Sequence, residues 1–229
     1  MAVVKFDCKG FSQFEPNQVW FTRAGKSESQ VKLNPKEFAS HFPALPAETD
    51  GGLIYSEIGT FLAVDKTRNI AVIPGGQYYK EGAMPVGVNY SSEHIYNQFT
   101  PGRRNYAMVC GEFLPRIGYL SKGERFTTNG VAFDTDLVTD ESVDKTDIIA
   151  TSKALHKQIF EDSFKDPKST TNKIYYGTLS ATSNGRLVIT QAVTPPDATK
   201  AIGGIVCQVV KAYTNADGTL SFMFQVLNA

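Results

Sequence analysis

Short apolar runs, separated by glycine, proline, asparagine and aspartate, dominate the chain from Gly51 onward. This pattern predicts β-strands joined by turns. Asp-Gly within the sequence NADG, at 215–218, favours a tight hairpin turn, so we expect the chain to end in a β-hairpin. The expected strands are residues 59–64, 69–73, 84–89, 106–110, 116–120, 173–181, 186–191, 202–213 and 219–227.

One segment has helical spacing instead. In SKALHKQIFEDSF, residues 152–164, the spacing places Leu155, Ile159 and Phe160 on one face and His156 on the polar side. An acidic stretch precedes this segment. We therefore expect residues 135–172 to form a helical insertion between two β-rich units.

The first fifty residues alternate short apolar pieces with polar, turn-prone ones. This alternation predicts an extended N-terminal arm over residues 1–50, preceding a β-rich body over 51–229. Asn34, Pro35 and Glu37 have the spacing of a helix start with a capping box, so one short helix is expected there.

The β-rich body contains an internal similarity. Residues 59–73 align without gaps to residues 177–191, with four identities at Gly59, Thr60, Ala63 and Arg68. We infer two related hairpin units, about 51–134 and 173–229. Because each exposes an apolar face that a lone hairpin cannot cover, the fold class expected is mainly β, a small β-barrel or sandwich built from the two units, with the arm and one inserted α-helix.

Between the units, the sequence GYLSKGERFTT at 118–128 is interpreted as a further hairpin. A phosphate-binding loop has the pattern Gly-x-x-x-x-Gly-Lys-Ser/Thr and leads into a helix. Here Lys122 precedes Gly123, and a strand-like sequence follows. The stretch therefore indicates sheet and not a nucleotide site.

Composition narrows the function classes. Lys+Arg and Asp+Glu are equal at 23 each, so the chain lacks the basic excess typical of nucleic-acid binding. Cys8, Cys110 and Cys207 are far apart, which favours free buried thiols in a reducing compartment. No stretch approaches the roughly 20 apolar residues that span a bilayer, and the N-terminal sequence lacks a long apolar region. We expect a chain folded in cytoplasm, without membrane or nucleic-acid partners.

No pattern of residues indicates a reaction. The histidines, His41, His94 and His156, lack metal-ligand spacing, and no Gly-x-Ser-x-Gly elbow is present. The acidic run 134–147 begins like a calcium loop, but Thr139 stands at the glycine position and Lys145 at that of the closing glutamate. A solvated loop is expected, and cation binding there is left open. We assign no catalytic, cofactor or metal residue; an enzyme would require His94, Asp134 or Asp136 to converge in a pocket.

The β-rich units resemble capsid decoration (cement) proteins of tailed bacteriophages. The resemblance covers roughly 51–134 and 173–229 and is carried by GTFLAVDKTRNIAVI with PVGV, by LPRIGYLSKGERFTTN, and by GTLSATSNGRLVI with AIGGIVCQVVKAYTNADGTLSFMFQVLNA. It implies a non-enzymatic virion protein, without cofactor, made in the host cytoplasm and bound to the major capsid protein on the outside of the shell. A homo-oligomer is expected, with a trimer favoured.

Two sets of residues are candidates for the partner surface. Arg103 and Arg104 could contact an acidic partner or point into water. In the strand SFMFQVL, alternation places Phe222, Phe224 and Val226 on one face and Met223, Gln225 and Leu227 on the other, where a neighbouring subunit could cover them. The alternative function is a head-fibre or tail-associated module that stacks host glycans on Tyr78, Tyr79, Tyr175 or Tyr176.

Overall fold

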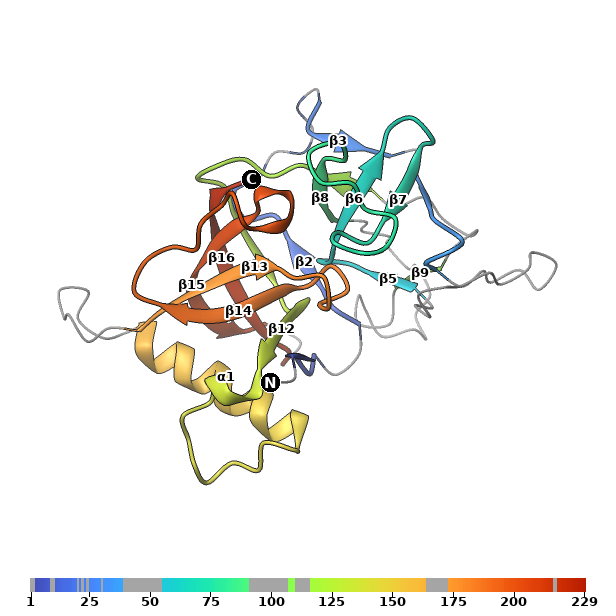
Figure 1. Cartoon of the computed structure of the whole chain (residues 1–229). Helices are drawn as coiled ribbons and strands as arrows, with labels where there is room; N and C mark the ends of the chain where they lie inside the picture. The colour runs from blue at the N-terminus through green and yellow to red at the C-terminus, as the bar shows by residue number, and fades with distance from the viewer. Residues whose placement is uncertain are drawn as a thin grey trace.

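Over the residues that it describes, the computed structural model of the chain is mainly β, with two large sheets, a two-stranded ladder and one α-helix (Figure 1). It describes residues 3–8, 11–19, 21, 23, 25–29, 31–38, 55–90, 107–109, 116–163, 173–215 and 218–229. Arg103, Arg104, His41, His94 and Cys110, which the sequence singled out, lie outside these ranges.

One sheet has six strands in the order β3-β10-β8-β6-β7-β4. All neighbours run antiparallel except β7 and β4, which are parallel. In chain order the strands are β3 (Ser27–Glu28), β4 (Lys32–Leu33), β6 (Phe61–Asp65), β7 (Ile70–Val72), β8 (Val86–Asn89) and β10 (Ile117–Gly118). A separate ladder pairs β5 (Tyr55–Glu57) with β9 (Ala107–Val109).

The other sheet has eight strands in the order β1-β12-β14-β13-β15-β16-β11-β2. Only β12 and β14 pair in parallel. Its strands are β1 (Val3–Lys5), β2 (Phe14–Glu15), β11 (Arg125–Thr128), β12 (Val131–Asp134), β13 (Ile174–Leu179), β14 (Leu187–Ala192), β15 (Val206–Thr214) and β16 (Leu220–Asn228).

The two sheets contain the same six-strand arrangement. Numbered along the chain, β3, β4, β6, β7, β8 and β10 lie in the order 1-6-5-3-4-2, and β11 to β16 lie in that same order. In both sets the second and fourth strands are parallel and the other pairs antiparallel. We call these the first and second six-strand sets. They begin at Ser27 and Arg125, so their boundaries differ from the expected 51–134 and 173–229.

The residue alignment behind the expected repeat does not match the strand registers. Gly59 precedes β6 at a positive φ of 82°, whereas Gly177 lies inside β13, paired with Cys207 and Ile189. The hairpin turn between β6 and β7 is also shorter than that between β13 and β14, because the last pairs are Asp65 with Ile70 and Leu179 with Leu187. The two sets therefore share a strand topology, but residues 59–73 and 177–191 do not occupy equivalent positions in them.

The segment expected to be an extended arm is part of the sheets over its described residues. Strands β1 and β2 extend the larger sheet at both edges, and β3 and β4 belong to the smaller one. Many of its large apolar side chains are buried in the common core: Phe6, Phe14, Val19, Phe21, Val31, Leu33 and Phe38. The expectation of a separate arm is therefore corrected for the described residues between 3 and 38.

Two further local expectations are corrected. At Asn34 the chain makes one hydrogen-bonded turn, in which Phe38 N–H donates to Asn34 O, and residues 35–38 are not an α-helix. The stretch 118–128 is not a hairpin: β10 pairs with β3 and β8, while β11 pairs with β16 and β2. The turn at Gly123 carries the chain from one sheet to the other.

The single described helix, α1 (Ile148–Ser163), packs against β15 and β16 at one end of the larger sheet (Figure 1). It begins earlier than predicted because Asp147 Oδ1 accepts the N–H groups of Ile149 and Ala150, which is an N-cap. Short 3-10 helices occupy Thr135–Leu137 and Ile202–Gly204.

The buried face of α1 differs from the predicted one. Leu155 and Ile159 are buried as expected, but Phe160 is 42% exposed and His156 is buried. The His156 ring packs on Phe222 at 5.4 Å between ring centroids, and Nε2 lies 3.0 Å from Tyr213 O. Burial of the imidazole lowers its pKa below the usual value, which keeps the ring neutral.

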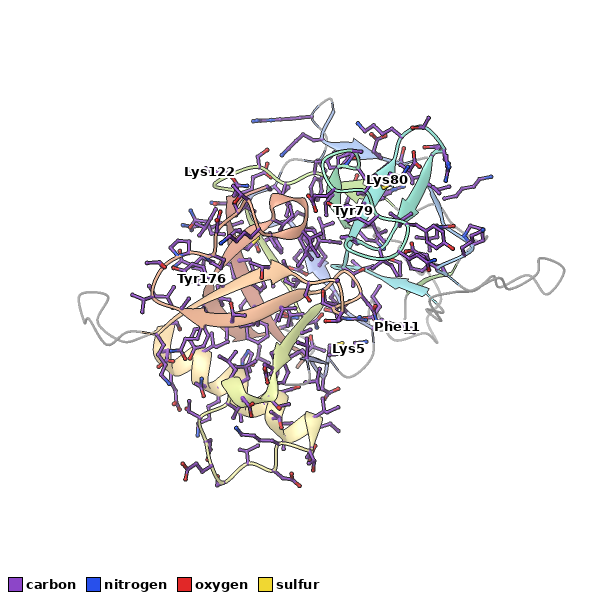
Figure 2. All side chains as sticks on the ribbon, viewed as in Figure 1. Lys5, Phe11, Tyr79, Lys80, Lys122 and Tyr176 are labelled. Atoms are coloured by element: carbon purple, nitrogen blue, oxygen red, sulfur yellow. The ribbon has the colours of Figure 1, made fainter. Side chains whose placement is uncertain are left out.

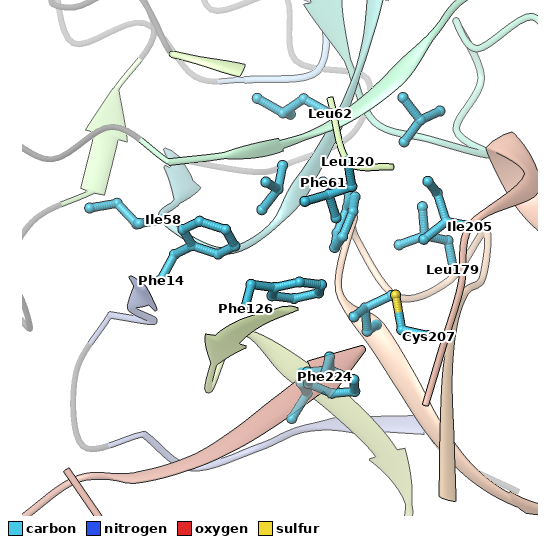
Figure 3. Packing of buried hydrophobic residues seen from close by; sticks show 14 of the residues in the cluster. Phe14, Ile58, Phe61, Leu62, Leu120, Phe126, Leu179, Ile205, Cys207 and Phe224 are labelled. Atoms are coloured by element: carbon cyan, nitrogen blue, oxygen red, sulfur yellow. The ribbon is translucent and has the colours of Figure 1, made fainter. Parts of the chain in front are cut away.

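A continuous hydrophobic core joins the two six-strand sets (Figure 3). Phe126 of β11 is at its centre, stacked on Phe224 at 5.5 Å and edge-on to Phe61 at 6.4 Å between centroids. Because Phe61 belongs to the first set and Phe224 to the second, the sets fold as one body around shared aromatic packing.

Candidate functional site

A buried polar cluster lies where the two sets meet, around the carboxylate of Glu57. This side chain, at the end of β5, is 1% exposed. Its Oε1 accepts hydrogen bonds from Lys5 Nζ at 2.6 Å and Arg186 Nη2 at 2.7 Å, and its Oε2 accepts Ser12 N–H at 2.9 Å. We call Glu57, Lys5, Arg186 and Ser12 the Glu57 junction.

Electrostatics of the junction favour the ionised carboxylate. Burial raises the pKa of Glu57, but the charges of Arg186 and Lys5, together with the Ser12 N–H, outweigh it and hold that pKa below 4.5. One carboxylate faces two cations, of which Arg186 is the more enclosed, with its side chain 12% exposed against 38% for Lys5. The contact with Arg186 is therefore the less screened by solvent.

Hydrogen bonds surrounding the junction link the same segments. Phe61 N–H of β6 donates to Gly185 O at 2.6 Å, directly before Arg186. Gln13 N–H donates to Asn129 Oδ1, and Thr128 Oγ1 donates to Gln13 O. The N-terminal segment, the first set and the turns of the second set are thus joined by buried hydrogen bonds.

The contacts of the junction connect parts of the fold. Both carboxylate oxygens accept hydrogen bonds, two from cations and one from a backbone N–H, and the lowered pKa makes the carboxylate a weak base. Cys8, nearby, is 2% exposed, and burial raises its pKa to about 11, so the thiol form dominates at neutral pH. Burial also raises the pKa of the fully enclosed Cys207. These two thiols behave as buried apolar groups, as the sequence predicted.

The predicted candidate interface forms one face of β16. Phe222, Phe224 and Val226 are buried in the core, and Met223, Gln225 and Leu227 are half-buried on the other face, so the alternation is confirmed. The pairing of β15 with β16 shifts register at two points, between Val206 and Cys207 and between Val209 and Lys211. Such β-bulges bend a strand and change the direction of its side chains.

Side chains of neighbouring strands frame this face. Arg125 Nη2 on β11 donates to Gln225 Oε1 at 3.4 Å, and Met223 lies opposite Thr127. Lys211 on β15 lies over the ring of Tyr213 at 5.5 Å. We call Arg125, Lys211, Met223, Gln225 and Leu227 the β16 outer face.

The tyrosines considered for glycan stacking are enclosed to different degrees. The Tyr175 and Tyr176 residues are each 3% exposed, so neither ring is open to a sugar. Tyr175 Oη donates to Asp162 Oδ2 at 2.6 Å and accepts from Gln158 Nε2, which fixes the ring beneath α1. Tyr78 and Tyr79 are partly buried against the core. Burial, with the nearby Glu81 carboxylate, raises the pKa of Tyr79 to about 12.

The carboxylates of the acidic loop stabilise its own backbone. Asp134 caps the 3-10 helix through Asp136 N–H, Asp140 accepts from Ser142, and Asp144 from Thr146. Hydrogen bonds from Ser142 and Thr146 lower the pKa values of Asp140 and Asp144. Among the described residues, no three His, Cys, Asp or Glu side chains converge as metal ligands do. The described part of the chain also has no helix with the length and apolarity to span a bilayer.

Sequence reasoning missed the Glu57 junction, because Lys5, Glu57 and Arg186 are separated by 52 and 129 residues. One signal was available: Glu57 is an acidic residue inside a β-rich stretch. A buried charge needs a partner, but the sequence does not identify which one.

Comparison of the chain with protein families, with curated proteins and with solved structures found no match.

Proposed function

We propose that this chain is a non-enzymatic structural protein of a tailed-bacteriophage virion, a capsid decoration protein that binds the major capsid protein and stabilises the shell. The observation that carries the proposal is that most of the stretches behind the resemblance belong to the two matching six-strand sets. The link to capsid proteins is an analogy of pattern, so the virion location is part of the proposal.

The internal contacts of the protein suit a stabilising role. The Glu57 junction and the shared aromatic core tie both sets and the N-terminal segment into one body. A rigid body loses little conformational entropy when it binds, so more of its contact energy stabilises the shell. The described cysteines and His156 are buried in structural contacts, which supports a non-enzymatic protein.

We place the shell contact on the β16 outer face. Three alternating residues of this face, Met223, Gln225 and Leu227, are half-buried. Two of them are apolar and one is polar. Arg125 and Lys211 at its border add positive charge, which favours an acidic partner surface. The glycan-binding alternative receives no such support, because the Tyr175 and Tyr176 rings are enclosed.

We further propose that each six-strand set closes as a small barrel. In the second set, β11 and β12 lie at opposite sides of the strand order, yet only Asn129 and Gly130 separate them in the chain. Such a short connection brings the two edges together, as closure requires. Strands β1 and β2 then line the gap, each paired with one of these edges. A crystal structure with β11 and β12 far apart would contradict closure.

The function is tested by co-sedimentation with empty heads assembled from the major capsid protein encoded in the same genome. We expect saturable binding and a higher thermal denaturation temperature of the heads when the protein is bound. Heads that neither bind the protein nor gain thermal stability would contradict the decoration role. Bovine serum albumin at the same concentration serves as the control for trapped protein.

A further inference from the structure

An apolar hollow lies between the edge strand β1 and the first turn of α1. It has a volume of about 300 Å³ and is lined by Lys5, Phe6, Asp7, Cys8, Ile148 and Ile149. Ile148 and Ile149, next to each other at the start of α1, are 43% and 52% exposed. Large aliphatic side chains exposed beside a hollow are typical of a contact surface.

Negative charge is concentrated in the chain segment that precedes this hollow's Ile148 and Ile149. The loop 134–147, which leads directly into α1, carries six carboxylates and one lysine. Asp136 and Glu141 are exposed, Lys145 Nζ lies 3.3 Å from Asp136, and Lys157 of α1 partly offsets Asp140. We call the hollow with this loop the acidic end. A partner that fits it presents positive charge around an apolar contact.

The opposite end of the molecule has the matching charge. The turn between β6 and β7 exposes Lys66 and Arg68, whose side chains are 63% and 72% accessible. Lys32 on β4 and Lys36 after it are exposed as well. We call Lys66, Arg68, Lys32 and Lys36 the basic tip. Figure 1 shows the β6–β7 turn and α1 with its preceding loop at opposite ends.

The described carboxylates near the basic tip only partly neutralise it. Glu28 lies 3.3 Å from Lys66 Nζ, and Asp65 lies 3.9 Å from Arg68 Nε while accepting the N–H groups of Thr67 and Arg68. In Figure 2, Lys80 lies in the same set, but the exposed Glu81 follows it in the chain, so this pair leaves the excess of positive charge on Lys32 and Lys36. The tip therefore stays positive.

We propose that copies of this chain associate head to tail, with the basic tip of one copy bound at the acidic end of the next. Complementary charge on two opposite ends of one chain favours this heterologous contact over a two-fold contact of either end with the same end of a second copy, which would place like charges together. Ile148 and Ile149 supply apolar contact area, and the charges set orientation and association rate. Such a contact closes into a ring or continues as a filament. The inference stands apart from the capsid proposal, because both surfaces belong to this chain.

The test uses two charge-reversal variants of the whole protein in sedimentation velocity experiments. One carries Asp136→Lys, Glu141→Lys and Asp144→Lys at the acidic end, and the other carries Lys66→Glu and Arg68→Glu at the basic tip. Each variant alone then has two ends of like charge and is expected to stay monomeric. In an equimolar mixture every contact is again complementary, so the mixture is expected to associate like the wild type.

Two controls make the test decisive. Lys122→Glu with Lys200→Glu changes as much charge as the basic-tip variant, at exposed positions outside both ends, and its association is expected to match the wild type. Wild-type association is expected to weaken at least about tenfold between roughly 0.05 and 0.5 M salt. Circular dichroism checks that each variant is folded. A wild type that stays monomeric at low salt, or a mixture that does not associate, would overturn the proposal.

Discussion

Arg186, at the entry to β14, donates through Nη2 to Oε1 of the buried Glu57 at the end of β5, over 2.7 Å. This contact joins the second six-strand set to β5, which lies in the chain between β4 and β6 of the first set. Lys5 shares the same oxygen, so one carboxylate holds three parts of the chain. The Glu57 junction connects the two sets through polar contacts, as the aromatic packing around Phe126 connects them through apolar contacts.

Replacing this carboxylate is expected to destabilise the fold strongly. Glu57→Gln leaves the Arg186 guanidinium enclosed without its counter-charge, and breaking a buried pair from one side costs about 3 kcal/mol or more of unfolding free energy. Urea unfolding followed by circular dichroism measures this loss.

A matched change on the surface provides the control. Glu161→Gln removes a carboxylate that is 60% exposed and 3.9 Å from Lys157 on α1, so its effect is expected to stay within about 0.5 kcal/mol. Equal losses for Glu57→Gln and Glu161→Gln would show that the junction carries no special stability.

The pKa values of two buried glutamates, Glu57 and Glu37, are expected to lie on opposite sides of the usual glutamate pKa of 4.5. Glu57 faces Arg186 and Lys5, which hold its pKa below 4.5 against the effect of burial. For Glu37, burial is the largest influence, and the N–H groups of Ile73 and Tyr78 offset it only in part, so its pKa lies above 4.5. Carbon-13 NMR of the side-chain carboxyls over an acid titration measures both.

The stability consequences have opposite signs. For Glu57 the stabilisation is present above the unfolded pKa of about 4.5 and is lost as the pH falls through the lower folded value. For Glu37 the contribution is present below that unfolded pKa and is lost as the pH rises through the higher folded value. A titration in which Glu57 takes up its proton above Glu37 would contradict this assignment of environments.

Gly59 is expected to tolerate no side chain. Its φ is +82°, and a Cβ would lie 2.3 Å from Thr128 Oγ1 and 2.8 Å from Gln13 O. Gly59→Ala should therefore cost about 3 kcal/mol or more, from left-handed strain and overpacking together. Gly82→Ala has a similar φ of +72° with no atom within 4 Å, and should cost only about 1 kcal/mol. Thermal unfolding of both variants separates crowding from strain, and equal losses would contradict the close approach at Gly59.

Adjacent residues of β16 are expected to respond differently to the same substitution. Phe224→Asp places an unpaired carboxylate against Phe126 in the core and should prevent folding. Met223→Asp, on the half-buried outer face, should remain folded by circular dichroism and lose binding to heads. A folded Met223→Asp protein that binds heads normally would exclude this face as the contact. An unfolded one would show that the chain itself covers Met223.

Much of the β-structure could be predicted from sequence, because strands after Gly51 have apolar runs and clear turn residues. The C-terminal hairpin of β15 and β16 is confirmed, with Gly218 at a φ of +78° in its turn. The two-residue strands β2, β3 and β4 could not be predicted, since they are too short for a periodic pattern and form by pairing with distant strands. The N-terminal segment forms strands because it pairs with distant parts of the chain, and its local sequence shows no strand pattern.

The helix shows a second limit of sequence patterns. From the spacing of apolar residues alone, Phe160 was predicted to face the core and His156 to face solvent. The buried face of α1 instead includes Thr151, Ser152 and His156. The imidazole of His156 can be buried because its Nε2 lies within hydrogen-bond distance of the Tyr213 carbonyl on β15. Polar residues that find partners within the fold are not visible to hydrophobic periodicity. The same reason hid the Glu57 junction.

The proposed decoration role is tested most directly by a cryo-electron microscopy reconstruction of virions from a phage that carries this gene. If the chain is a decoration protein, we expect density for the two six-strand sets on the outside of the head, with the β16 outer face toward the major capsid protein. Purified virions that lack this chain, or that carry it inside the shell, would contradict this role.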